Sequence, residues 1–449
     1  MNTDTNARTR TFFGQPMALA YLSFTEAWER FSYYGMTALL VLYMSQELLL
    51  QGHVGNIAGF PAFRAALESV FGPMTTLALA SQIMGLYTGL VYFTPVLGGW
   101  IADRWLGRRL AVMIGAVMMS AGHLAMAFDA SFLLALALLI VGSGLLKGNI
   151  STQVGQLYAE TDGEGRTRAF AIFSIGINVG AVSGPLLCGL LAQLYGWHAG
   201  FGLAGALMLI GLFTYIAGFR YMPADRPRAQ PMPTAAPLNR RQWRIVGALA
   251  AVSAITIFQS IGYYQNTNLG LIWIDHSVDL DLLGFHVPVA WFNSVDPLAS
   301  ILAVPLLLVL WRRQAARGRE PDDLGKIATG AWLTAAANLV LVAACTISTR
   351  SSLLVPLLYD TLLGIGFLYY WPTLLALVSR AAPARIKATL MGAVFLTLFV
   401  GNVIIGWLGG FYQRMTPTAF WSMHAGIAAF GGVLAVGLKR PLKRALGVD

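Results

Sequence analysis

Long, nearly uncharged apolar runs recur along most of this 449-residue chain. A helix needs roughly 20 mostly apolar residues to cross a hydrocarbon core about 30 Å thick. Because lipid offers no partner for open backbone polar groups, each run must form a helix, and the short alternating segments of a β-barrel are not seen. The sequence therefore predicts an all-α integral membrane protein with twelve transmembrane helices, at 17–46, 75–102, 108–128, 131–158, 167–195, 200–219, 243–274, 289–311, 325–347, 353–379, 388–412 and 418–438.

The composition agrees with lipid as the main solvent. Hydrophobic residues make up 57% of the chain and charged residues only 11%, against about 25% charged residues in ordinary soluble proteins. A soluble protein with so few charges could not cover its surface. Cys188 and Cys345 both fall within predicted spans, so they indicate neither a disulfide framework nor a metal-ligand spacing.

The net charge of +10 raises the question of a nucleic-acid partner, and the positions of the charges argue against one. An even number of spans places both termini on one side of the membrane. If that side is the cytoplasm, 25 of the 30 basic residues lie in inside connections and tails, 3 lie in outside connections and 2 lie within spans. This asymmetry is the positive-inside rule. We expect a multi-pass protein of the cell (inner) membrane with both termini in the cytoplasm, in contact with the lipid bilayer and with no nucleic acid.

A Pro-rich segment at 221–242 separates six spans from six. The expected organisation is a cytoplasmic tail at 1–16, an N-terminal six-helix bundle at 17–220, a cytoplasmic linker at 221–242, a C-terminal six-helix bundle at 243–438 and a second tail at 439–449. The first 16 residues lack the apolar core of a signal peptide. Two pseudo-symmetric halves around a midplane site are typical of secondary transporters. On layout alone, a flexible loop between unrelated spans is the alternative.

Four charged residues lie within predicted spans. Glu26, Glu29 and Arg30 fall in the first span, where each costs roughly 2.5–3.5 kcal/mol to insert. Glu26 and Arg30 are four residues apart and can pair on one helix face. Lys147 lies far from both ends of its span, so we expect Glu26 or Glu29 to pair with it. Protonation of a glutamate would free a cation for an anionic substrate group, although a purely structural ion pair is the alternative.

Several segments resemble the proton-dependent oligopeptide transporters (POT/PTR), a branch of the major facilitator superfamily. The first-helix signature of that family matches in full, and the other matches are less specific. The resemblance covers about 17–438 and rests on Glu26 to Gly35 in the first helix, Gly98 to Arg109 in the loop after the second, Lys147 in the fourth, Phe173 to Gly180 in the fifth, and Met391, Gly392, Phe395 and Leu396 in the eleventh.

The resemblance implies a major-facilitator-type fold and a function. Its members are proton-coupled symporters of di- and tripeptides or peptide-like molecules that work by alternating access, so no cofactor beyond the proton gradient and no enzymatic activity are expected. Carried over, the proton-coupling residues are Glu26, Glu29, Arg30 and Lys147. The implied substrate-binding residues of the first half are Arg30, Tyr33, Tyr34, Tyr87, Lys147 and Asn178.

This sequence departs from the family where the far end of a peptide would bind. Thr37 stands where members commonly have an arginine, and Tyr264 precedes Gln265 where they commonly have an acid; loss of both charges together avoids a stranded one. Phe367 stands at the place of the glutamate that binds the peptide's amino group. Trp371 replaces the serine before Pro372.

Two aspartates are possible substitutes for the missing acid, Asp296 and Asp360. The alternatives are that Asp296 caps a helix beside Pro297 and that Asp360 lies near the outer surface. We expect the second half of the site to contain Tyr264, Gln265, Asp296, Phe367 and Trp371. A related possibility is the same fold moving a non-peptide anionic or aromatic metabolite, including as an exporter. A membrane enzyme or receptor is disfavoured, because no nucleophile–base arrangement, metal-ligand spacing or phosphate-binding loop is found.

Overall fold

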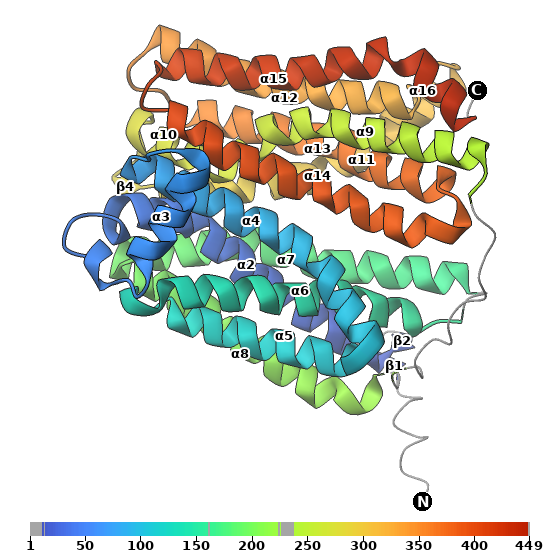
Figure 1. Ribbon diagram of the computed structural model, residues 1–449, viewed down its shortest axis with the longest axis horizontal. Helices are drawn as coiled ribbons and strands as arrows, with labels where there is room; N and C mark the ends of the chain where they lie inside the picture. The colour runs from blue at the N-terminus through green and yellow to red at the C-terminus, as the bar shows by residue number, and fades with distance from the viewer. Residues whose placement is uncertain (1–10, 13, 160–161, 223–224, 226–237, 448–449) are drawn as a thin grey trace, which may run out of the picture. The chain divides into compact units, whose positions relative to one another are not determined.

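The computed structural model describes residues 11–12, 14–159, 162–222, 225 and 238–447. Over these residues the chain is helical apart from two short antiparallel hairpins, β1 (Thr11–Phe12) with β2 (Gln15–Pro16) and β3 (Asp281–Leu282) with β4 (Phe285–His286) (Figure 1). Three of the described α-helices are short: α3 (Phe60–Phe71), α10 (Leu269–Ser277) and α16 (Lys439–Leu446). The twelve long ones are α2 (Met17–Tyr43), α4 (Thr76–Ile101), α5 (Arg108–Ala125), α6 (Phe132–Gln156), α7 (Gly163–Tyr195), α8 (Trp197–Gly218), α9 (Arg240–Tyr264), α11 (Val295–Ala316), α12 (Asp323–Ile347), α13 (Leu354–Ala381), α14 (Lys387–Leu408) and α15 (Pro417–Gly437).

The long helices coincide with the twelve predicted spans to within a few residues at most ends, which confirms the all-α membrane fold. Ten segments of the described chain are long and apolar enough to cross a membrane. The segments of α2 and α5 are the two that fall short of that test. Every 18-residue window of α2 contains Glu26, Glu29 and Arg30, and α5 is only 18 residues long and begins with two arginines.

The predicted span 243–274 is broken in the structure. Helix α9 ends at Tyr264, a short turn follows at Gln265–Thr267, and α10 begins at Leu269. The side chain of Asn266 accepts a hydrogen bond from the Thr267 backbone N–H at 2.7 Å. The Asn268 amide donates to the Ser81 hydroxyl at 2.8 Å. Asparagine side chains that bond in this way compete with the helical backbone, which is why apolar periodicity alone did not reveal the break.

The connection between the first two spans contains a helix that the sequence did not predict. Helix α3 follows Gly59, whose φ of +76° suits glycine at a helix start. The Ala58 N–H donates to the carbonyl of Ala130 at 3.1 Å, which ties this connection to the segment before α6.

The chain forms two compact units. One comprises the described residues of Met1–Pro73 and Leu90–Pro231, and the other those of Met74–Gly89 and Met232–Asp449. Helix α4 thus contributes its first half to the second unit and its second half to the first. The predicted bundle boundaries stay a prediction, and the five linker prolines together with most of the N-terminal tail lie outside the described residues.

In the first unit, a stripe of glycines lets α7 approach the backbone of α2. A Cβ atom added to Gly176, Gly180 or Gly184 would lie 2.7, 2.4 or 2.4 Å from the carbonyl oxygen of Ser23, Ala27 or Phe31, respectively. Small residues four apart allow such close packing of membrane helices. The stripe therefore sets the position of the α2 face that carries the charged residues.

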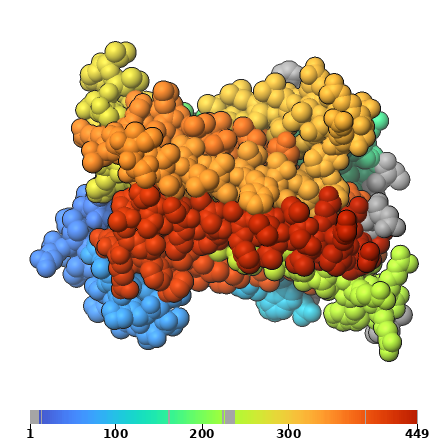
Figure 2. Space-filling view, turned by 90° about the horizontal axis from the view of Figure 1, so that it is seen from above, coloured from blue at the N-terminus to red at the C-terminus, as the bar shows by residue number. Residues whose placement is uncertain are grey.

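In the second unit, one apolar cluster joins α9, α12, α13, α14 and α16. Its members include Leu249, Ile327, Leu374 and Leu442. Helix α9 starts with a reciprocal cap, in which the Asn239 side chain accepts from the Gln242 N–H and the Gln242 side chain accepts from the Asn239 N–H. Figure 2 shows the start of α9 in lime beside the red helix α16 at one end of this unit.

Candidate functional site

A buried ion cluster on α2 occupies the interior of the first unit. Glu29 is fully buried, and Glu26 and Arg30 are 4% and 8% exposed. The Arg30 Nε lies 3.2 Å from Glu26 Oε1, and the same guanidinium donates to the Glu29 carboxylate. Glu26 Oε2 and Glu29 Oε1 have no hydrogen-bond partner among the described residues. One arginine thus holds two carboxylates, each with an oxygen left over.

Lys147 on α6 faces aromatic rings rather than a carboxylate. Its ammonium lies 4.0 Å from the ring centroid of Tyr33 and 5.7 Å from that of Tyr92. The expected direct pairing of Lys147 with Glu26 or Glu29 is not found at ion-pair distance in the part of the chain that the structure describes. The physical reason is that the guanidinium of Arg30 occupies both acids, while a cation over an aromatic face retains favourable electrostatics.

The remaining residues predicted in the first unit surround this arrangement. Tyr33 also lies against the Arg30 guanidinium, at 5.3 Å from ring centroid to Cζ, and its ring meets that of Tyr34 edge-on at 5.2 Å. Asn178 is half-buried on α7, two residues before Gly180. The Thr37 hydroxyl donates a hydrogen bond to the Tyr33 carbonyl at 2.9 Å. The residue that stands in place of the family's arginine is therefore hydrogen-bonded within its own helix.

The second unit holds Asp296 at the start of α11. Its carboxylate accepts a hydrogen bond from the Tyr263 hydroxyl, and the nearby Ser300 hydroxyl donates to the Gly364 carbonyl at 3.0 Å. Ser294 occupies the position before α11, so Asp296 is not the cap of that helix. The lack of a side chain at Gly364 admits this carboxyl group against α13, because a Cβ there would lie 2.9 Å from Asp296 Oδ1.

Asp360 lies one helical turn before Gly364 on α13, and its side chain is buried at 2% exposure, so it does not face solvent. Asn266 donates a hydrogen bond to it, and Asp296 is close enough to act on it electrostatically. Neither aspartate forms an ion pair with a Lys or Arg among the described residues. The structure therefore brings the two candidate acids into one buried region of the second unit.

Aromatic rings continue from these acids along α13. The ring of Phe367 stacks on Tyr263 at 5.2 Å and on Trp371 at 6.4 Å, with interplanar angles of 27° and 26°. Trp371 in turn meets Phe395 edge-on at 5.4 Å. The residue at the place of the missing glutamate is thus packed between rings, with no acidic group of its own.

Three further predicted residues belong to the second unit. Tyr264 packs against Tyr263 at 4.8 Å, Gln265 is fully buried, and Tyr87 is 3% exposed in the first half of α4. The side-chain amide of Gln265 has no hydrogen-bond partner in the described chain. Sequence reasoning missed Tyr92, Tyr263 and Ser300 as neighbours of the charged groups, because their only signal is helical spacing from a residue already singled out.

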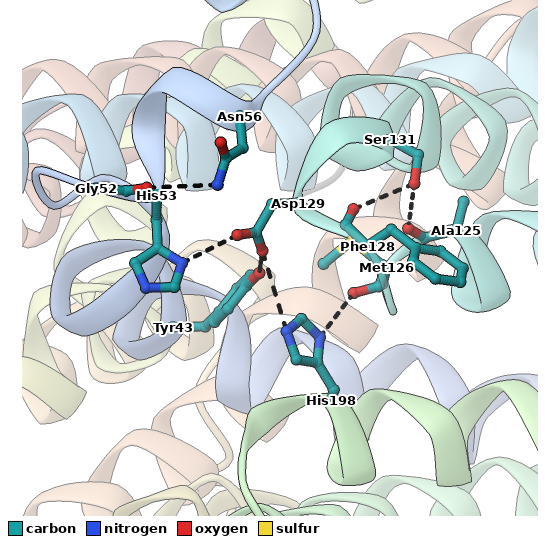
Figure 3. A network of polar contacts seen from close by, with 10 residues as sticks. All are labelled: Tyr43, Gly52, His53, Asn56, Ala125, Met126, Phe128, Asp129, Ser131 and His198. Atoms are coloured by element: carbon teal, nitrogen blue, oxygen red, sulfur yellow. Dashed lines mark hydrogen bonds and ion pairs between the residues drawn. The ribbon is translucent and has the colours of Figure 1, made fainter.

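A second polar cluster lies in the first unit at the end of α2, centred on Asp129 (Figure 3). Its carboxylate accepts from the Tyr43 hydroxyl at 2.8 Å and lies 3.0 Å from His53 Nδ1. His198 Nε2 lies 4.0 Å from the same carboxylate, and Glu47 adds a nearby negative charge. The hydrogen bond to Asp129 raises the pKa of the exposed His53 above its ordinary value. This cluster joins the end of α2, the connection after it, the connection before α6 and the start of α8, and no group of three potential metal ligands occurs among the described residues.

Comparison with known proteins points to one family. The model of the POT family matches residues 109–242 and 238–422. A di-/tripeptide transporter of Lactococcus lactis subsp. cremoris is 28% identical over 98% of this chain and 99% of its own. The peptide transporter YePEPT of Yersinia enterocolitica is 29% identical over 99% and 98%. The crystal structure of a peptide transporter POT in complex with sulfate superposes with a TM-score of 0.86, at 27% identity and 98% coverage of both chains.

The family match extends over more than half of the chain, and the structural match extends over nearly all of it. Transporters of this family are proton-driven and use no cofactor. The resemblance noted in the sequence is confirmed. The chain is a multi-pass membrane transporter of the POT family, and not an enzyme.

Proposed function

We propose that this transporter carries di- and tripeptides, or peptide-like molecules, inward together with protons. The observation that carries the proposal is that the two buried cations of the first unit have different surroundings. Arg30 is engaged by Glu26 and Glu29, whereas Lys147 lies over tyrosine rings and forms no ion pair with any described residue. A substrate carboxylate can therefore meet Lys147 without first breaking an ion pair.

Proton coupling follows from the remaining half of the cluster. Each glutamate keeps one oxygen without a hydrogen bond, and a proton placed there removes one of the two charges that hold Arg30. The guanidinium is then free to join Lys147 at the substrate carboxylate. Substrate binding and proton binding thereby favour each other, which is the linkage that a symporter requires.

We propose that Asp296 binds the substrate's amino group. Asp360 is close enough to Asp296 to interact with it electrostatically. Both are buried without a basic partner in the described part of their unit, so an ammonium group would supply the missing counter-charge. The names of the Lactococcus and Yersinia relatives support peptides as the substrate class.

The rings around Phe367 favour one alternative. A stacked aromatic group replaces the family's acid, so the same fold could instead carry an anionic or aromatic metabolite that has no amino group. An export direction belongs to this alternative. We further propose that the protein lies in the inner membrane with both termini in the cytoplasm, on the strength of its basic-residue asymmetry.

Uptake into proteoliposomes tests the proposal. Labelled dialanine should accumulate under an inward proton gradient and not when the gradient is collapsed. Glu29→Gln should abolish gradient-driven accumulation and retain counterflow exchange, because it removes the proton site and leaves Lys147 in place. Absence of dialanine uptake, combined with thermal stabilisation by a non-peptide anion, would replace the first proposal by the alternative. Unchanged accumulation in Glu29→Gln would remove this residue from the coupling step.

A further inference from the structure

Helix α16 has two different faces. Leu442 and Leu446 are 8% and 7% exposed and join the apolar cluster that includes α9. Lys439 and Lys443 turn toward Asp322, with ammonium-to-carboxylate distances of 2.9 and 3.5 Å. The other two basic residues of this helix, Arg440 and Arg444, are exposed.

The first five residues of α9 include three more exposed arginines, Arg240, Arg241 and Arg244. Helix α16 packs against α9, and a Cβ placed on Gly447 at the end of α16 would lie 3.5 Å from a guanidinium nitrogen of Arg241. Two segments about two hundred residues apart in the sequence thus converge on one surface (Figure 2). We call these five residues the arginine surface: Arg240, Arg241, Arg244, Arg440 and Arg444.

No carboxylate of the described chain pairs with any member of the arginine surface. Neighbouring basic residues do have acidic partners: Lys439 and Lys443 pair with Asp322, and Arg380 pairs with Asp323. The local acids are therefore already engaged, and five positive charges face outward without a counter-charge among the described residues. Their natural partner is an anion from the surroundings.

The position of the arginine surface specifies the source of that anion. One membrane-crossing segment begins at Arg240 and another ends at Gly437, so both arginine-bearing segments lie where the hydrocarbon core gives way to headgroups. The side chain of Trp243, near the start of α9, is 60% exposed, as is typical of aromatic residues at the membrane–water interface. Guanidinium groups bind phosphate oxygens in a bidentate manner.

We infer that the arginine surface binds the phosphate groups of anionic phospholipids and docks the C-terminal helix on the membrane. The positive-inside rule accounts for the number of basic residues on this side of the membrane. It does not account for their convergence from α9 and α16 on one unpaired surface. An anionic lipid at this place links α9 to α16.

The test uses the purified full-length protein in a neutral detergent, titrated with palmitoyl-oleoyl phosphatidylglycerol or phosphatidylcholine, with thermal unfolding as the readout. Phosphatidylglycerol should raise the Tm and phosphatidylcholine should not. The triple variant Arg240→Gln/Arg241→Gln/Arg444→Gln should need at least 10-fold more phosphatidylglycerol for half of the effect. The matched control Arg317→Gln/Arg350→Gln/Arg414→Gln removes the same charge from scattered exposed positions and should differ from the unmodified protein by less than 2-fold.

Two further arms make the outcome decisive. Inorganic phosphate at the same concentration should give no stabilisation, because a free anion lacks the acyl chains that hold it at headgroup depth. Raising NaCl from 50 to 500 mM should weaken the phosphatidylglycerol effect in the unmodified protein, an arm that does not depend on how well the variant folds. Equal losses in the two triple variants, equal stabilisation by both lipids, or full stabilisation by inorganic phosphate would each overturn the inference.

Discussion

Replacing Gly180 by alanine tests whether the glycine stripe of α7 holds the charge cluster of α2 in place. The added Cβ would lie 2.4 Å from the Ala27 carbonyl oxygen, 2.6 Å from the Phe31 nitrogen and 2.7 Å from the Arg30 Cβ. Ordinary contacts of a Cβ atom lie at 3.4–4 Å. Two of the three neighbours are backbone atoms that cannot rotate away, so α2 and α7 must move apart.

The size of the effect follows from this overlap. Forcing an extra methyl group into a well-packed interior costs about 1–3 kcal/mol. In a domain of 150–250 residues, each kcal/mol lowers the Tm by about 2–4 °C. We therefore expect the Tm of Gly180→Ala to fall by about 2–12 °C, and uptake to fall as well, because Arg30 is displaced from its carboxylates.

Gly202→Ala is the matched control, since Gly202 lies in α8 of the same unit and an added Cβ would meet no atom within 4 Å. Alanine is favoured over glycine in helices by up to about 1 kcal/mol. Both variants share this gain, so the control should have an unchanged or higher Tm. Thermal unfolding of the two proteins in one detergent measures the difference. If Gly180→Ala behaved like Gly202→Ala, the close approach of α2 and α7 would not position the site.

Two other expectations concern charged groups. Arg30→Met leaves Glu26 and Glu29 buried without a counter-charge and should destabilise the protein by about 3–5 kcal/mol. Lys147→Met breaks no ion pair and should impair dialanine uptake with little change in Tm. Similar Tm losses in both variants would contradict these different roles. The raised pKa of His53, due mainly to its hydrogen bond with Asp129, means that this contact stabilises the fold fully below about pH 6.5 and less as the pH rises through the folded-state pKa. The Tm measured from pH 5.5 to 8.5 should decline accordingly, and His53→Gln should flatten that decline; identical pH profiles would show that the histidine contributes nothing.

The sequence alone was sufficient to predict the membrane-spanning helices. Lipid imposes the same local requirement on every span, namely about 20 apolar residues with a closed backbone, and this requirement can be seen without any knowledge of neighbours. The first-helix signature likewise identified the family, and the charges that it places in one span are buried in the structure. The sequence did not predict the break after Tyr264 or helix α3, because both depend on polar side-chain hydrogen bonds and on contacts with distant segments.

What each charged residue contacts was decided by the tertiary structure. The sequence predicted the pair of Glu26 with Arg30 on one helix, but only the structure showed that Arg30 also binds Glu29 and that Lys147 lies over the Tyr33 ring. Likewise, Asp296 appeared as one of two possible acids, and its bond to Tyr263 is visible only when α9 and α11 are folded together. Hydrophobic length is a property of each segment by itself, whereas a partner on another helix is a property of the packed bundle. The membrane fold and the Glu26–Arg30 pair within one helix were therefore predictable from the sequence, and the contacts between helices were not.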